Sequence, residues 1–161
     1  MKYTNKIFKK TAVLEEYLPL SIKSESSLEN ANYLIFRYEN NSLLEIVFNE
    51  SNGYIHKINM IICKDYHMVD STFDIPNDLI TKKGDILVER EDDVTTHKFE
   101  CIIYKDAIRL EISNEAVIER IYSDNIVWEL NKDGKLVSFT LYRQSPEIIE
   151  HTKNELSYDN Q

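Results

Sequence analysis

The chain has 161 residues, of which 28 are Asp or Glu and 19 are Lys or Arg, so its formal net charge is −9. Its three glycines, Gly53, Gly84 and Gly134, each stand alone, which excludes the glycine-rich loops that cradle phosphates in P-loop and dinucleotide-binding enzymes. The acidity argues against a dedicated nucleic-acid binder, because such a protein must neutralise phosphates with Lys and Arg. The length predicts a single domain, residues 1–161.

The N-terminal segment is basic but does not read as an export signal. The first ten residues, MKYTNKIFKK, carry +4, which leaves −13 on the rest of the chain. The segment that follows, TAVLEEYLPL, is interrupted by Glu15 and Glu16, so it lacks the apolar stretch of a signal peptide. We therefore expect a cytoplasmic protein in which Cys63 and Cys101 are free thiols.

The first predicted element is a helix over residues 5–18. Apolar residues from Ile7 to Leu18 recur at helical spacing, and the segment ends before Pro19. Residues 114–121 are ambiguous between a short helix and a strand.

Residues 33–142 predict an antiparallel β-meander. The stretches 33–39, 43–50 and 54–62 are rich in β-branched and aromatic residues, and Ser51-Asn52-Gly53 marks a hairpin turn. A second hairpin is predicted where 125–131 and 135–142 flank Lys132-Asp133-Gly134.

We expect a C-terminal helix over 145–156, in which Ser145 is the N-cap and Pro146 is the first helical residue. These elements together predict a mainly β (α+β) fold. We expect a curved antiparallel sheet, or a partly closed barrel or sandwich, of about 8–10 strands with one or two terminal helices.

Two Cys-His pairs are candidates for a metal or catalytic site. Cys63-x₃-His67 and His97-x₃-Cys101 would supply zinc ligands only if each pair lay on a helix, because four residues along a strand span about 13 Å. Both cysteines lie in apolar runs that predict burial, which disfavours a Cys-His nucleophile. We therefore expect no catalytic residue, no metal site and no cofactor.

The densest acidic segment follows Gly84 and has two interpretations, a solvated hairpin turn or a contact surface for a basic partner, because clustered carboxylates steer cationic proteins. We expect it to act with one aromatic side chain, since tyrosine is enriched at protein interfaces. The predicted partner-binding residues are Asp85, Glu89, Glu91, Asp92, Asp93 and Tyr66.

The layout of residues 33–62 (YLIFRYENNSLLEIVFNESNGYIHKINMII) and 125–156 (NIVWELNKDGKLVSFTLYRQSPEIIEHTKNEL) resembles that of immunity proteins of bacterial polymorphic toxin systems, of the contact-dependent growth inhibition type. The resemblance implies a cytoplasmic, non-catalytic protein that binds and blocks a cognate toxin C-terminal domain. Many such toxins are basic nucleases, so an acidic inhibitor can imitate the phosphate backbone. The residues leave two other classes open: a β-barrel-like protein that binds a small apolar ligand, and an enzyme built on carboxylates or a Cys-His pair.

Overall fold

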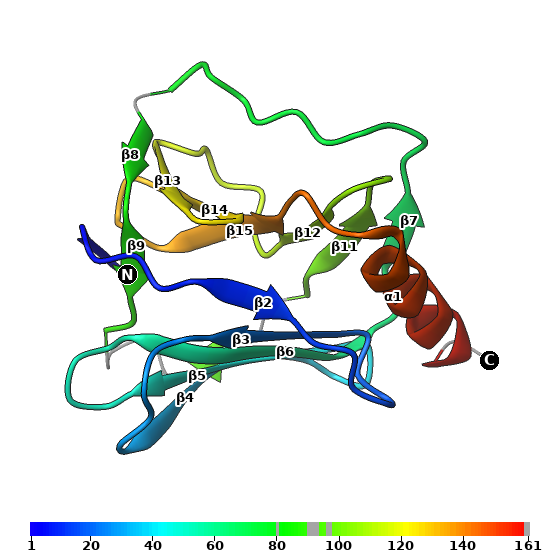
Figure 1. The fold of residues 1–161 in the computed structure, drawn as a ribbon, viewed down its shortest axis with the longest axis horizontal. Helices are drawn as coiled ribbons and strands as arrows, with labels where there is room; N and C mark the ends of the chain where they lie inside the picture. The colour runs from blue at the N-terminus through cyan, green and yellow to red at the C-terminus, as the bar shows by residue number, and fades with distance from the viewer. Residues whose placement is uncertain (80, 90–93, 96–97, 160–161) are drawn as a thin grey trace.

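Two facing layers of β-structure with one helix at their side make up the molecule, as the computed structural model shows (Figure 1). The structure describes residues 1–79, 81–89, 94–95 and 98–159. The lower layer in Figure 1 is a six-stranded sheet, and the upper layer is a seven-stranded sheet.

The six-stranded sheet has the order β10-β4-β5-β6-β3-β2, and its strands are β2 (Lys10–Ala12), β3 (Leu20–Ser24), β4 (Ala31–Tyr38), β5 (Ser42–Asn49), β6 (Ile55–Cys63) and β10 (Val94–Thr95). The seven-stranded sheet has the order β7-β11-β12-β15-β14-β13-β8, and its strands are β7 (Tyr66–Met68), β8 (Thr81–Lys83), β11 (Glu100–Ile103), β12 (Ile108–Glu111), β13 (Glu119–Ser123), β14 (Ile126–Leu130) and β15 (Leu136–Leu141). A two-stranded sheet pairs β1 (Lys2–Thr4) with β9 (Asp85–Leu87), and the helix is α1 (Pro146–Asp159).

The prediction of a mainly β fold with a terminal helix is confirmed. Over the described residues, neither large sheet closes into a barrel. These residues form 15 strands, more than the eight to ten expected, because strands of two to four residues are too short to show an alternating pattern.

Both predicted glycine hairpins are present. Gly53 lies in the turn between β5 and β6 with φ of 76°, and Gly134 lies in the turn between β14 and β15 with φ of 72°. Positive φ is the conformation that glycine adopts without steric cost, which is why these turns use it.

The expected meander is not antiparallel throughout. β4 pairs with β10, β11 with β7, and β13 with β8 in parallel register. The chain also passes between the layers, since β7 joins the seven-stranded sheet directly after β6 of the six-stranded one. Hairpin turns predict only antiparallel neighbours, and parallel neighbours far apart in sequence leave no local turn signal.

The expected helix over 5–18 is wrong. This segment instead contains the strand β2, followed by a loop that leads to β3. The apolar stripe that suggested the helix does not face the core, since Ile7 and Leu14 are each 45% exposed. The polar Lys10 is the residue that enters the interior, at 2% exposure.

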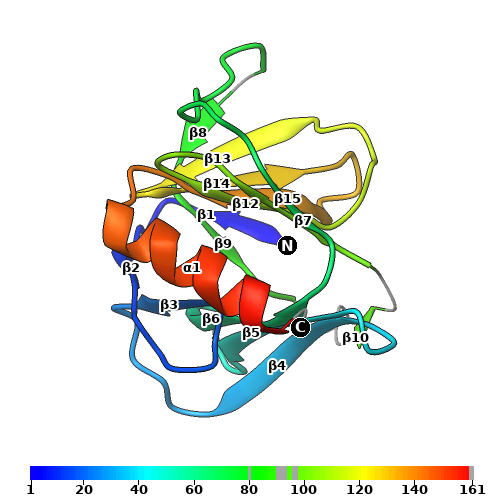
Figure 2. The same cartoon turned by 90° about the vertical axis from the view of Figure 1, so that its right-hand side faces the viewer.

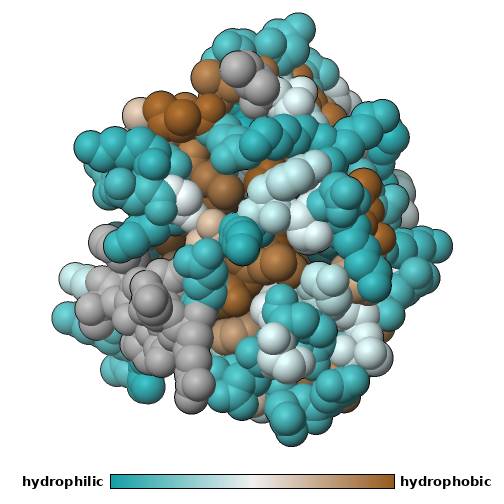
Figure 3. Space-filling view, turned by 90° about the vertical axis from the view of Figure 1, so that its left-hand side faces the viewer, coloured by the Kyte–Doolittle hydropathy of each residue, from teal (hydrophilic) through white to brown (hydrophobic). Residues whose placement is uncertain are grey.

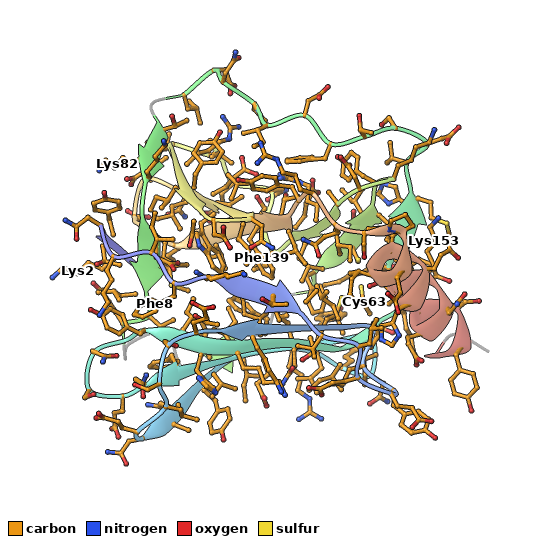
Figure 4. All side chains as sticks on the ribbon, in the orientation of Figure 1. Lys2, Phe8, Cys63, Lys82, Phe139 and Lys153 are labelled. Atoms are coloured by element: carbon orange, nitrogen blue, oxygen red, sulfur yellow. The ribbon has the colours of Figure 1, made fainter. Side chains whose placement is uncertain are left out.

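The hydrophobic core fills the space between the two layers. In the six-stranded sheet the inward row includes Leu34, Ile46 and Ile58, which are paired across β4, β5 and β6. In the facing sheet Phe139 and Trp128 are paired across β15 and β14 and are fully buried. These residues belong to one continuous cluster, and Figure 4 labels Phe139 within it.

The C-terminal helix covers one open side of the two layers (Figure 2). Its predicted cap is confirmed, because the Ser145 hydroxyl accepts a hydrogen bond from the Ile148 amide at 3.4 Å. Ile149 and Leu156 are buried in the core cluster, and the Thr152 hydroxyl donates to the Pro19 carbonyl at 2.8 Å. The helix is thus fastened both to the core and to the loop that precedes β3.

Candidate functional site

The predicted acidic segment is not one continuous exposed surface. Asp85 is only 4% exposed, so the prediction that it contributes to an exposed acidic surface is wrong. Glu89 is exposed at the end of this segment. Glu91, Asp92 and Asp93 lie outside the described residues.

Asp85 is buried because it is the counter-ion of Lys10. The two side chains form a buried ion pair between β9 and β2, and the Trp128 indole N–H donates to the other carboxylate oxygen of Asp85 at 3.1 Å. The Lys10 ammonium also donates to the Phe8 carbonyl at 2.8 Å and to the Ser123 hydroxyl at 2.7 Å. All three ammonium hydrogens of Lys10 therefore have an acceptor.

A lysine next to a serine is an arrangement that can activate a nucleophile, so this cluster bears on the enzyme alternative. Burial lowers the pKa of Lys10, and the charge and hydrogen bond of Asp85 oppose that shift. Ser123 is 0% exposed and Lys10 is 2% exposed, so neither reaches a substrate in this conformation. The cluster joins three sheets and has a structural role.

Tyr66, the predicted aromatic contact, lies on the edge strand β7. It is half-buried and packs against the core cluster, and its partner across the strand pair is Cys101. Its neighbour Met68 is more accessible, at 56% exposure. The structure does not bring Tyr66 together with the described acidic residues of the predicted surface into one cluster of contacts.

The two cysteines are buried free thiols near each other. The Cys63 thiol donates to the Asp65 carbonyl at 3.2 Å, and the same carbonyl accepts the Cys101 amide at 2.9 Å. Burial raises the pKa of Cys63 to about 12 and that of Cys101 well above its ordinary value. His67 is exposed, and His97 lies outside the described residues. In the part of the chain that is described, no three potential ligands gather to hold a metal ion.

A second charged network lies on the outward face of the seven-stranded sheet. Glu129 is 2% exposed and accepts hydrogen bonds from Arg109 at 2.5 Å, Arg120 at 2.8 Å and Ser138 at 2.8 Å. Burial favours a raised pKa for Glu129, but the two guanidinium groups and the Ser138 hydroxyl outweigh it and hold the pKa below its ordinary value. This carboxylate is fully engaged and does not project into a site.

A long connection, residues 69–79, crosses the outward face of the same sheet (Figure 1). Phe73 packs edge-on against Tyr104 with ring centroids 5.3 Å apart, and the Tyr122 hydroxyl donates to the Pro76 carbonyl at 3.1 Å. Asp78 forms an ion pair with Arg120 at 2.5 Å, which lowers the pKa of Asp78. The connection is therefore attached at several points along its length.

Two pockets in the described part of the chain have mixed linings of polar and apolar side chains. One, of about 390 Å³, is lined by Glu115, Ala116, Ile118, Asn131, Lys132 and Asp133. The other, of about 290 Å³, is lined by Lys98, Glu100, Glu111, Ile112, Ser113 and Asn114.

Figure 3 shows the face with the N-terminal strand, where hydrophobic side chains form a strip between hydrophilic ones.

The charge of the molecule lies outside its core. Among the described residues, the buried carboxylates Asp85 and Glu129 are balanced by the buried cations Lys10 and Arg120. Among described side chains that are exposed or half-buried, carboxylates outnumber Lys and Arg by six. Acidic side chains therefore predominate on the surface that a partner meets.

Two aromatic side chains are highly exposed at positions that no sequence pattern indicates. Tyr17 is 66% exposed and Tyr158 is 64% exposed, more than any other large hydrophobic side chain that the structure describes. Tyr17 falls in the segment that was expected to be a helix, and Tyr158 lies beyond the expected end of the C-terminal helix. Neither position follows a pattern that distinguishes it from the other tyrosines.

Searches with protein-family models and among curated protein sequences find no match to this chain. Among the described residues, no helix combines the length and the apolar character needed to cross a membrane.

Proposed function

We propose that this chain is an immunity protein, which neutralises a basic toxin domain by stoichiometric protein–protein contact. One observation carries the proposal: the buried charges balance, while carboxylates outnumber cations by six on the described accessible side chains. A surface of this kind attracts a cationic protein over long range and raises its rate of association. The buried charged groups Lys10, Asp85 and Glu129 are engaged within the chain, which supports a binding role over a catalytic one.

The test begins with the neighbouring gene. We expect it to encode a large secreted protein with a variable C-terminal domain, and that domain, purified, should form a 1:1 complex with this chain by titration calorimetry. Co-expression of the chain should restore growth to cells that produce the domain. A neighbouring metabolic operon, or failure of the two proteins to bind, would overturn the proposal.

The salt dependence of binding tests the electrostatic part of the same proposal. The association rate constant should fall by about tenfold or more between low and high ionic strength, because salt screens charges separated by more than a Debye length. An association rate that is independent of salt would show that surface charge does not drive the encounter.

A further inference from the structure

The loop between β2 and β3 and the helix α1 form one continuous part of the surface. His151 donates through Nε2 to the Leu18 carbonyl at 2.9 Å, next to the exposed Tyr17. Tyr158 follows His151 by seven residues, which places it two turns along on nearly the same face of the helix. Figure 2 shows α1 running across this side of the molecule. We name these residues, Leu14, Tyr17 and Tyr158 with the adjoining Glu16 and Glu155, the tyrosine surface.

The loop that presents Tyr17 is held firmly on both sides. Glu15 pairs with Lys57 at 3.1 Å, and the Leu18 amide donates to the Glu15 carbonyl at 3.3 Å. Pro19 is buried, and its carbonyl accepts from Thr152. Tyr17 therefore stands on a preorganised turn, which reduces the entropy that a partner must remove on binding.

The backbone of Tyr17 is strained. Its φ is 69°, in the left-handed region that bulky residues rarely adopt. Its side chain is 66% exposed, so burial within this chain offsets little of that strain. Backbone strain of this kind is concentrated at ligand-binding and other functional sites.

The charge around these rings favours a cationic partner. Glu16 is exposed and Glu155 is half-buried. The last turn of α1 has no basic residue, so the partial negative charge of its terminal carbonyl groups is not offset there. Lysine and arginine side chains bind both to carboxylates and to the faces of tyrosine rings.

We propose that the tyrosine surface is the docking site for a basic protein, whose Lys or Arg side chains lie against Tyr17 and Tyr158. This proposal rests on the proposed function, because it names the face on which the basic toxin domain binds. It replaces the predicted surface around Asp85, which is buried, with one whose aromatic and acidic groups are accessible.

The deciding variant is Tyr17→Gly, because glycine adopts positive φ without strain. Its thermal midpoint should be equal to or above that of the wild type, while its affinity for the toxin domain should fall by about tenfold or more. Tyr158→Ala should weaken binding in the same way. Tyr33→Ala, at a tyrosine that is 45% exposed on β4, is the matched control and should leave the affinity unchanged.

A second measurement separates failure of this surface from failure of the proposed function. A nona-arginine peptide is titrated into the labelled chain, and amide chemical shifts should change at residues 14–18 and 151–158 in the wild type but not in Tyr17→Gly. If the toxin domain binds Tyr17→Gly with full affinity, the surface is wrong and the function stands. If the toxin domain does not bind the wild-type chain but the peptide binds at the tyrosine surface, the function is wrong and the surface stands. A dimer that Tyr17→Gly abolishes would overturn the basic partner in favour of a second copy of the chain.

Discussion

At the scale of single residues, the interior is organised by charged side chains that are paired across long stretches of sequence. Lys10 and Asp85 are 75 residues apart and meet where β2, β9 and β13 come together. No local pattern predicts such a pair, so the acidic run after Gly84 predicts a surface position for Asp85 that the fold does not give it. The ion pair also explains why the helix predicted over residues 5–18 does not form. Its counter-ion holds Lys10 in the core, where helical spacing would have placed apolar residues.

The variant Lys10→Met tests this pair. It leaves the Asp85 carboxylate buried without its cation and should lower the free energy of unfolding by about 3–5 kcal/mol. The double variant Lys10→Met, Asp85→Asn should lose less than the sum of the single changes, since the amide oxygen still accepts from Trp128. Urea denaturation followed by far-UV circular dichroism measures all three, and additive effects would show that the pair is not coupled.

The Glu129 carboxylate should make the fold sensitive to acid. Its pKa is lower in the folded protein than in the unfolded chain, so the unfolded state binds more protons at low pH. The resulting stabilisation is fully present above the unfolded value of about 4.3 and is lost as the pH falls through the folded value. Denaturation midpoints between pH 6 and 2 should fall less steeply for Glu129→Gln, whereas an equal slope would assign the acid sensitivity to other carboxylates.

At the scale of elements, the features that depend on neighbouring residues in the sequence were the ones predicted correctly. Both glycine hairpins and the capped C-terminal helix are present, because turn residues and caps act within a few positions. The parallel partners β7, β8 and β10 were missed, since each depends on a strand that is remote in sequence. The site was harder to predict than the fold. The exposure of Tyr17 depends on a turn, whereas the spacing of apolar residues in this segment predicts a helix.

The two hairpin glycines allow backbone strain to be separated from steric contact. Both have positive φ, so Gly134→Ala should cost about 1–2 kcal/mol. A Cβ at Gly53 would also lie 2.6 Å from the Val88 carbonyl oxygen, whereas the nearest atom at Gly134 is 3.2 Å away. Gly53→Ala should therefore be clearly more destabilising in thermal denaturation, and equal losses would mean that the β9 segment moves aside at no cost.

At the scale of the whole molecule, one core connects every layer that could support a docking surface. The same buried cluster contains Ile58 of the six-stranded sheet, Trp128 of the seven-stranded sheet and Leu156 of α1. A surface built on α1 and on the loop before β3 is attached to this core by Leu156 and by the hydrogen bond from Thr152 to the Pro19 carbonyl. Such an attachment fits the proposed binding role, because preformed surfaces bind with a smaller loss of conformational entropy.

A shared core predicts that the chain unfolds in a single cooperative step, as expected for one domain over residues 1–161. Trp128 is the only tryptophan and is fully buried, so its fluorescence reports on the seven-stranded sheet. Circular dichroism at 222 nm has its main helical contribution from α1, the one helix in the described residues. The two signals should give coincident urea transitions. If the helix signal is lost first, α1 separates from the core before the sheets do, and the tyrosine surface would not be preorganised.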